Sequence, residues 1–314
     1  MQIRNLGASG LRVSAIGLGC NNFGGRLDLE ASRTVIHRAL DAGITLFDTA
    51  DIYGERGGSE TVLGRVLGAR RQEIVLATKF GGAMDDAGRL KGASRGYIVH
   101  AVEASLRRLQ TDWIDLYQIH FPDPLTPIEE TLRALDDLIR AGKVRYIGCS
   151  NLPAWQMVEA QWTARDRRLT PFASGQYEYS LLVRQLEAEL LPAMEAYRMG
   201  LLPYFPLANG LLTGKYHAGQ SAPAGARLAT SKGLAARYLT PGNLELSARL
   251  EGFAQERGHT LLELAFGWLL SRPQVASVIA GATRPEQVSQ NAAAGGWELT
   301  AEDRAALAPL LAAS

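Results

Sequence analysis

The chain has 314 residues, 46% of them hydrophobic and 21% charged, which suits one large α/β barrel or two medium domains. Its formal net charge of +1, with no basic run, argues against binding to nucleic acid or to an anionic membrane surface. Two cysteines without a CxxC pair, no apolar leader and no run of about 18 apolar residues predict a cytoplasmic protein with no disulfide, metal site or transmembrane helix.

Short apolar runs recur along the chain and predict eight strands. Each run is apolar until its last residues, which is typical of parallel strands buried on both faces. The predicted strands are residues 13–19, 44–50, 73–79, 114–120, 144–150, 172–178, 201–205 and 275–281.

Amphipathic helical patterns separate these runs, so that strand and helix repeat about every 30 residues. This repeat predicts a single domain over residues 1–314, a (β/α)8 TIM barrel with a short N-terminal β-hairpin and a long loop after strand seven. A doubly wound sheet is the alternative, disfavoured because no GxGxxG follows the first strand. The predicted helices are residues 30–42, 94–109, 127–141, 153–165, 184–198, 243–257 and 260–271.

The stretch from residue 206 to residue 233 is rich in Gly, Ala, Ser and Pro and predicts one long loop. A loop of that length in a compact domain is usually a lid or a binding loop. A disordered insertion is the alternative.

Polar residues stand where the predicted strands end, and a barrel brings those ends to one mouth. Asp48 ends the second strand, with Tyr53 five residues later, Lys79 ends the third strand and His120 the fourth. Taken singly, each residue has a structural explanation, such as a turn cap or a solvated rim. Together they predict an active site. Further polar residues at later strand ends are Ser150, Asn151, Gln176 and Tyr204.

These four residue types can deliver a proton to an oxygen atom. Tyr53 has an ordinary pKa of about 10, which a nearby ammonium such as Lys79 would lower. Asp48 could keep a buried Lys79 protonated, and a neutral His120 could orient a carbonyl group. No nucleophile paired with a base and no metal-ligand spacing is evident, so the pattern indicates hydride transfer from a cofactor.

Two glycine-containing segments near the C-terminal strands are candidates for binding phosphate. The first, residues 206–215, ends at Lys215, and the second, residues 281–287, contains Arg284 before a proline suited to starting a helix. Tyr204 could stack on a nicotinamide ring, although a packed barrel aromatic explains it equally well.

The chain resembles the aldo-keto reductases over essentially its whole length, and most of all the bacterial branch related to potassium-channel β subunits. The matching stretches include "RNLGASGLRVSAIGLG", "LFDTADIYG", "IDLYQIH", "GKVRYIGCSN" and "VIAGATRPEQVSQN". The resemblance implies that Tyr53 donates the proton in carbonyl reduction, that Lys79 paired with Asp48 tunes Tyr53, and that His120 orients the carbonyl.

The resemblance also implies a site for NADPH or NADP+. Its nicotinamide and ribose end would contact Gly19, Cys20, Asp48, Ser150, Asn151, Gln176 and Tyr204. Its pyrophosphate would contact Phe205, Pro206, Leu207, Ala208, Gly210, Leu212 and Lys215, and its adenosine end Gly281, Thr283, Arg284, Gln287 and Asn291.

Two departures from the family pattern bear on the cofactor. Phe205 replaces a serine whose hydroxyl meets the pyrophosphate in many members, so that hydroxyl contact is lost or comes from elsewhere. Gly281 and Gln287 replace the Lys and Arg that grip the 2′-phosphate, which leaves Arg284 as the basic residue of that segment. NADPH is still favoured because a guanidinium can bind phosphate bidentately, and NADH is the alternative.

Three functions are compared. The favoured one is reversible NADPH-dependent reduction of aldehydes or ketones. The second is a slow redox-sensing NADP(H)-binding protein, and the third is a barrel enzyme that forms a Schiff base on Lys79.

Asn21, Asn22 and Phe23 are expected in the substrate pocket, where the two amides favour hydroxylated carbonyls. The substrate itself, the preferred reaction direction and the oligomeric state are not indicated.

Overall fold

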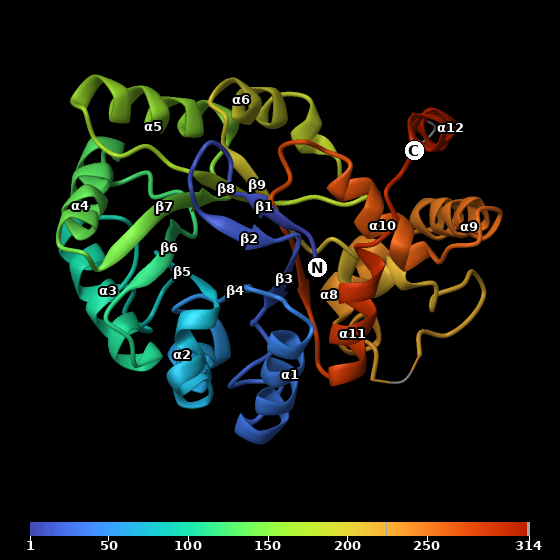
Figure 1. The fold of residues 1–314 in the computed structure, drawn as a ribbon, viewed down its shortest axis with the longest axis horizontal. Helices are drawn as coiled ribbons and strands as arrows, with labels where there is room; N and C mark the ends of the chain where they lie inside the picture. Colours follow the sequence, from blue (N-terminus) through green and yellow to red (C-terminus); the bar gives the residue numbers. More distant parts are fainter. Residues whose placement is uncertain (224, 313–314) are drawn as a thin grey trace.

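The computed structural model describes residues 1–223 and 225–312 of the chain. Eight parallel strands form one sheet in the order β10-β3-β4-β5-β6-β7-β8-β9 (Figure 1). Backbone hydrogen bonds close it, because Leu201 donates to Gln274 O at 2.7 Å and accepts from Ala276 N at 2.9 Å. The predicted (β/α)8 barrel is confirmed. Its strands are β3 (Ile16–Gly19), β4 (Leu46–Asp48), β5 (Val75–Phe80), β6 (Ile114–Ile119), β7 (Val144–Ser150), β8 (Ser174–Glu178), β9 (Gly200–Tyr204) and β10 (Val278–Gly281).

Helices surround the barrel, and several begin with the side-chain caps that the sequence offers. Ser94 accepts a hydrogen bond from Tyr97 N at the start of α3, and Thr260 with Glu263 forms a capping box at the start of α10. The helices around the barrel are α1 (Leu29–Asp41), α2 (Tyr53–Leu67), α3 (Arg95–Leu109), α4 (Ile128–Arg140), α5 (Ala154–Arg167), α6 (Leu190–Ala196), α10 (Leu261–Leu270) and α11 (Pro285–Ala294).

The hydrophobic core has two layers. The larger layer lies between the barrel and its helices. The smaller one fills the barrel interior and is closed from below by the N-terminal hairpin, β1 (Ile3–Asn5) paired with β2 (Arg12–Ser14). The interior side chains are Leu6, Leu11, Val13, Leu46, Ala77, Leu116, Leu202, Ala276 and Ile279. Since this end is plugged, the opposite mouth is left for a site.

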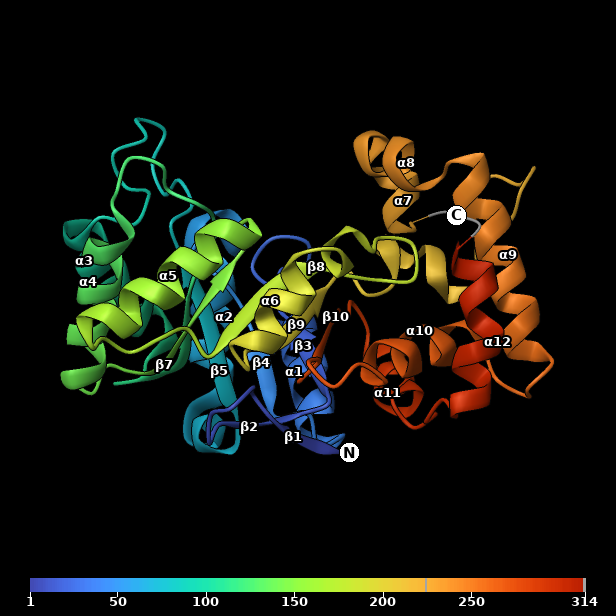
Figure 2. The same ribbon diagram turned by 90° about the horizontal axis from the view of Figure 1, so that it is seen from above.

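The structure differs from the prediction mainly in the segment after β9. The predicted loop contains a 3-10 turn, η3 (Ala208–Thr213), and two short helices, α7 (Arg227–Thr230) and α8 (Lys232–Tyr238). Residue 224 of that loop lies outside the described residues. The short helices form because Leu228 and Tyr238 are buried and the Ser231 side chain caps α8. In Figure 2 they lie on the same side of the barrel as α9 (Pro241–Gln255) and α12 (Ala301–Ala312).

Three other predicted elements have different bounds. The predicted first strand is two strands, β2 and β3, separated by Ala15. The predicted helix over residues 184–198 is a short turn, η2 (Gln185–Glu187), followed by α6. A further turn, η1 (Gly68–Glu73), and α12 are additional elements. Among the described residues, no helix has the length and apolar character needed to span a membrane.

Candidate active site

A strained turn carries Tyr53. Asp48 is the last residue of β4, and Tyr53 opens α2. The four residues after Tyr53 have positive φ, with 59° at Glu55 and 68° at Arg56, so regular helix begins only beyond Gly57. Each non-glycine residue in this left-handed conformation costs roughly 1–2 kcal/mol. The surrounding structure therefore holds Tyr53 in a fixed place.

A buried ion pair lies at the base of the site. Lys79 Nζ donates to Asp48 Oδ2 at 2.7 Å and to Thr49 O at 2.8 Å. The other carboxylate oxygen, Asp48 Oδ1, accepts from Gln176 Nε2 at 2.8 Å and from Gln118 Nε2 at 3.3 Å. With its hydrogen-bonding capacity so filled, the pair is stable away from water.

Tyr53 and His120 face each other above this pair. Their ring centroids are 5.6 Å apart with an interplanar angle of 82°, and Lys79 Nζ lies 5.1 Å from the Tyr53 ring centroid. The His120 ring also stacks on Phe121 at 4.1 Å. The four residues that the sequence predicts as catalytic thus lie together at the mouth of the barrel. These residues, called the tetrad below, are Asp48, Tyr53, Lys79 and His120.

The ionisation of these groups follows from burial and charge. Burial raises the pKa of Tyr53, and the opposing effect of Lys79 is smaller, so the net shift is opposite to the predicted lowering. Burial lowers the pKa of Lys79, but Asp48 and Tyr53 reverse this and leave it raised. Burial, aided by Lys79, lowers the pKa of His120 to about 2. Near neutral pH, Tyr53 is therefore a phenol, Lys79 an ammonium and His120 a neutral imidazole.

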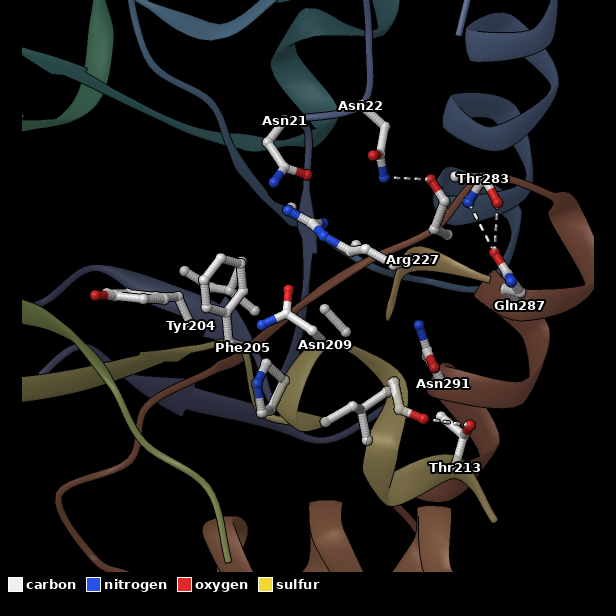
Figure 3. A pocket seen from close by; sticks show the side chains of 18 of the residues that line it. Asn21, Asn22, Tyr204, Phe205, Asn209, Thr213, Arg227, Thr283, Gln287 and Asn291 are labelled. Carbon is white, nitrogen blue, oxygen red and sulfur yellow. Dashed lines mark hydrogen bonds between the residues drawn. The ribbon is translucent and has the colours of Figure 1, made fainter. Parts of the chain in front are cut away.

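A cavity of about 1210 Å³ is lined by Asp48, Tyr53 and His120 at one end. It extends to Gln287 and Asn291 on α11, which Figure 3 labels. This volume is somewhat larger than the range of about 300–1,000 Å³ that is usual for small-molecule sites, which suits a large ligand. It is lined by these predicted residues: Gly19, Cys20, Asn21, Asn22, Asp48, Tyr53, His120, Ser150, Asn151, Gln176, Tyr204, Phe205, Pro206, Leu207, Gly210, Lys215, Gly281, Thr283, Arg284, Gln287 and Asn291.

Four predicted residues do not line this cavity. Lys79 lies beneath it, with a fully buried side chain. Phe23, Ala208 and Leu212 are fully buried in the larger core layer. Phe23 therefore packs the core in this structure instead of facing the expected substrate pocket.

Hydrogen bonds organise the cavity wall beside the tetrad. Ser150 Oγ donates to Gln176 O at 2.9 Å, and Asn151 Nδ2 donates to His120 O at 3.0 Å. Tyr204 Oη donates to Asn151 Oδ1 at 2.9 Å. The last bond fixes the Tyr204 ring along the wall, where its face is available to a flat ligand.

Four basic residues line the rest of the cavity: Arg26, Lys215, Arg227 and Arg284. In Figure 3 the Arg227 guanidinium lies between Asn21 and Phe205. Burial, then Arg284 and Arg26, lowers the pKa of Lys215, and burial with Arg26 lowers that of Arg227. Within residues 1–223 and 225–312 none of the four forms a salt bridge, so this part of the cavity suits a polyanion.

Comparison with known proteins identifies the family. The model of the aldo/keto reductase family matches residues 15–312. The chain belongs to the aldo/keto reductase family. It is therefore a nicotinamide-dependent oxidoreductase that acts on carbonyl or alcohol groups.

Three relatives of this aldo/keto reductase illustrate the range of names in the family. A "probable voltage-gated potassium channel subunit beta" of Arabidopsis thaliana is 41% identical over 93% of this chain and 90% of its own. The "uncharacterized oxidoreductase YrpG" of Bacillus subtilis is 38% identical over 92% and 89%. The "L-glyceraldehyde 3-phosphate reductase" of Escherichia coli is 36% identical over 93% and 86%.

The cavity of this aldo/keto reductase fits a nicotinamide dinucleotide in shape and charge. The tetrad and Tyr204 lie at one end, and Thr283, Arg284 and Asn291 at the other. A Cβ built on Gly210 would lie 3.1 Å from Lys215 Nζ, so the missing side chain keeps the space beside that ammonium open.

Sequence reasoning misses three contributors to the site of this aldo/keto reductase. Gln118 supports Asp48 and lies two residues before His120, on the same face of β6, so the two-residue strand period could have revealed it. Arg26 and Arg227 carry no such signal, because Arg26 lies in an irregular loop and Arg227 begins the short helix α7 within the long segment after β9. Glu55 and Arg56 lie away from the cavity, and Arg56 pairs with Asp86 at 2.5 Å.

Proposed function

We propose that this aldo/keto reductase reduces aldehyde or ketone groups to alcohols with NADPH, with Tyr53 as the proton donor. The observation that carries the proposal is the neutral Tyr53 facing a neutral His120 above the buried Lys79–Asp48 pair. The reaction is reversible, so the same residues would serve alcohol oxidation.

The bound nicotinamide would supply the hydride to the carbonyl carbon. His120 donates a hydrogen bond to the carbonyl oxygen and orients it, and Tyr53 then gives its hydroxyl proton to that oxygen as negative charge develops. The Lys79 ammonium stabilises the resulting phenolate, because it lies 5.1 Å from the Tyr53 ring centroid. Asp48 keeps Lys79 charged during this step.

The cofactor would lie along the lining residues, with the nicotinamide ring against Tyr204 and its carboxamide near Ser150, Asn151 and Gln176. Because Gln176 Nε2 is bonded to Asp48, its Oε1 is the atom left for that amide. Lys215 and Arg227 would neutralise the pyrophosphate. Arg284 would bind the 2′-phosphate that distinguishes NADPH from NADH.

A substrate panel tests the activity. The purified chain is mixed with NADPH and with aldehydes, ketones and hydroxylated aldehydes, and the loss of reduced-nicotinamide absorbance is followed. Hydroxylated aldehydes are favoured, because the amides of Asn21 and Asn22 line the cavity. Absence of turnover with every carbonyl, despite NADPH binding measured by fluorescence, would contradict the proposal.

The similarity to a probable potassium-channel β subunit favours a second candidate, a slow redox-sensing protein that retains its cofactor. The two candidates differ in the rate of cofactor release. Stopped-flow measurement of NADP+ release separates them, because an enzyme in steady turnover releases product many times per minute and a sensor holds it.

A further inference from the structure

A second cluster of ionisable groups lies behind the Tyr53 turn, outside the cavity. Asp51 is 1% exposed and Glu60 0% exposed, and only one basic side chain, Arg108, meets them among the described residues. Arg108 binds Glu60, with Nε 2.7 Å from Glu60 Oε2. Asp51 is thus left as a second buried carboxyl group without a salt bridge of its own.

Hydrogen bonds connect Asp51 to strand β5 and to helix α3. Its backbone N–H donates to Lys79 O at 3.1 Å, which ties the turn to the end of β5. On α3, the Tyr97 hydroxyl lies 3.3 Å from Asp51 Oδ2 and 3.3 Å from Gly82 O. Asp51 is two residues before Tyr53, so this network bears directly on where Tyr53 lies.

The hydroxyl of Tyr97 has one proton and two acceptors within reach. If Asp51 is protonated, its carboxyl can donate to Tyr97 Oη while Tyr97 donates to Gly82 O, and both contacts are hydrogen bonds. If Asp51 is ionised, the Tyr97 hydroxyl holds the only proton of the three groups. It can then donate to the Asp51 carboxylate or to Gly82 O, but not to both. The buried Asp51 Oδ1, which has no hydrogen-bond partner among the described residues, would then carry unpaired charge.

The turn itself depends on the same cluster. A Cβ on Gly57 would lie 2.6 Å from Arg108 Cδ, so the Arg108 side chain packs directly against the strained residues that follow Tyr53. A new charge at Asp51 competes with Glu60 for Arg108. The pairing that supports the turn is therefore sensitive to the protonation of Asp51.

We propose that the protonated carboxyl of Asp51 is a positioning group for Tyr53, and that its ionisation loosens the turn and slows hydride transfer. This inference rests on the proposed role of Tyr53. Burial, followed by Glu60, raises the pKa of Asp51 to about 7, while Arg108 opposes the shift.

Of the other groups near Asp51, two tyrosines and one aspartate have pKa values that are shifted away from neutral pH. Burial raises the pKa values of Tyr97 and of Tyr117, which face it from α3 and β6. Backbone hydrogen bonds outweigh burial and lower the pKa of Asp85, which interacts with Tyr97 from the loop after β5. Glu60 and Arg108 are bound to each other.

The test compares Asp51→Asn with the unmodified protein. Asn is uncharged at all pH values, and its NH2 group can donate to Tyr97 Oη, so it mimics the protonated acid. Hydride transfer to 4-nitrobenzaldehyde is measured in a single turnover at saturating NADPH from pH 5.5 to 8.5. We expect the rate of the unmodified protein to fall about threefold through pH 7, and that of Asp51→Asn to stay flat.

Two further variants complete the test. Asp51→Ala removes the bridge, so its rate should be low at all pH values without a step near pH 7. Asp112→Asn changes an exposed carboxylate and should keep the unmodified profile. The infrared carbonyl band of a protonated carboxylic acid should be present at pH 6 and absent in Asp51→Asn.

A step near pH 7 that persists in Asp51→Asn, or its absence from the unmodified protein, would overturn the inference. So would an Asp51→Asn variant that changes the pH dependence of stability but leaves the rate profile unaltered. Failure of the proposed function is distinguishable, because the unmodified protein would then show no hydride transfer at any pH.

Discussion

Lys79 Nζ lies 2.7 Å from Asp48 Oδ2 in a buried pair, with side-chain exposures of 0% and 4%. Among the described residues neither charge has another ionic partner, and Gln118 and Gln176 occupy the second carboxylate oxygen. The pair therefore contributes to folding as well as to the ionisation of Tyr53.

Removing one charge of the pair should cost stability as well as activity. Lys79→Met leaves Asp48 buried and unpaired, so the free energy of unfolding should fall by about 3–5 kcal/mol. The turnover number should fall by about 10²-fold or more, because Tyr53 loses the ammonium that stabilises its phenolate. Urea unfolding and steady-state kinetics measure the two effects.

The matched control is an exposed pair of the same length. Arg133 Nη2 lies 2.7 Å from Glu129 Oε1 on the surface of α4. Arg133→Met should change stability by less than about 1 kcal/mol and leave turnover unaltered. Equal losses in the two variants would contradict a special role for the buried pair.

His120 should contribute to acid sensitivity. Its pKa is lowered to about 2 in the folded protein, whereas the unfolded chain binds a proton near pH 6.5. Its contribution is present above pH 6.5 and is lost as the pH falls. Between pH 7 and pH 5 this loss is about 2 kcal/mol.

Urea unfolding of the unmodified protein and of His120→Gln at both pH values measures the His120 contribution. The variant should lose about 2 kcal/mol less than the unmodified protein over this range. If the free energy of unfolding falls equally in the two proteins, His120 keeps an ordinary pKa in the folded state.

Gly57 should be needed for the turn after Tyr53. Its φ is 113°, and an added Cβ would meet Arg108 Cδ at 2.6 Å. Gly57→Ala should therefore lower stability by about 1–3 kcal/mol and reduce turnover, because the turn that holds Tyr53 shifts. Gly252 in α9 has open space around it, and Gly252→Ala should instead stabilise the protein by about 0.5–1 kcal/mol. Thermal unfolding and steady-state kinetics of both variants measure these effects. Equal stability and turnover in the two variants would contradict a need for glycine at residue 57.

Arg284 should set the preference for NADPH. Arg284→Ala should weaken NADPH binding about tenfold or more and NADH binding far less, because only NADPH carries a 2′-phosphate. Fluorescence titration with both cofactors gives the two dissociation constants. Arg33→Ala, which removes an exposed partner of Glu30, serves as the control. If NADPH binding and NADH binding weaken equally, Arg284 contacts a part of the cofactor that both dinucleotides share.

The sequence predicts the barrel, and with it the closeness of Asp48, Tyr53, Lys79 and His120, because both depend on short, regular patterns. Buried strands are continuous apolar runs, and the residues ending them must meet at one mouth whatever the loops do. The tetrad residues Asp48, Lys79 and His120 stand at or directly after strand ends.

Other features depend on three-dimensional packing that no local pattern records. The short helices α7 and α8 exist because Leu228 and Tyr238 are buried by distant elements. Arg26 reaches the cavity from the loop after β3, where its Nη2 donates to Gly225 O at 3.0 Å. The direction of the Tyr53 pKa shift also depends on burial, which a sequence pattern does not give.

The central claim is that Tyr53 donates the proton, and Tyr53→Phe tests it most directly. The substitution removes one oxygen atom and keeps the ring that faces His120 and Lys79. In a single turnover with bound NADPH and an aldehyde that the unmodified protein reduces, hydride transfer should slow by about 10²–10⁴-fold while NADPH affinity stays the same. Unchanged hydride transfer in Tyr53→Phe would contradict the account.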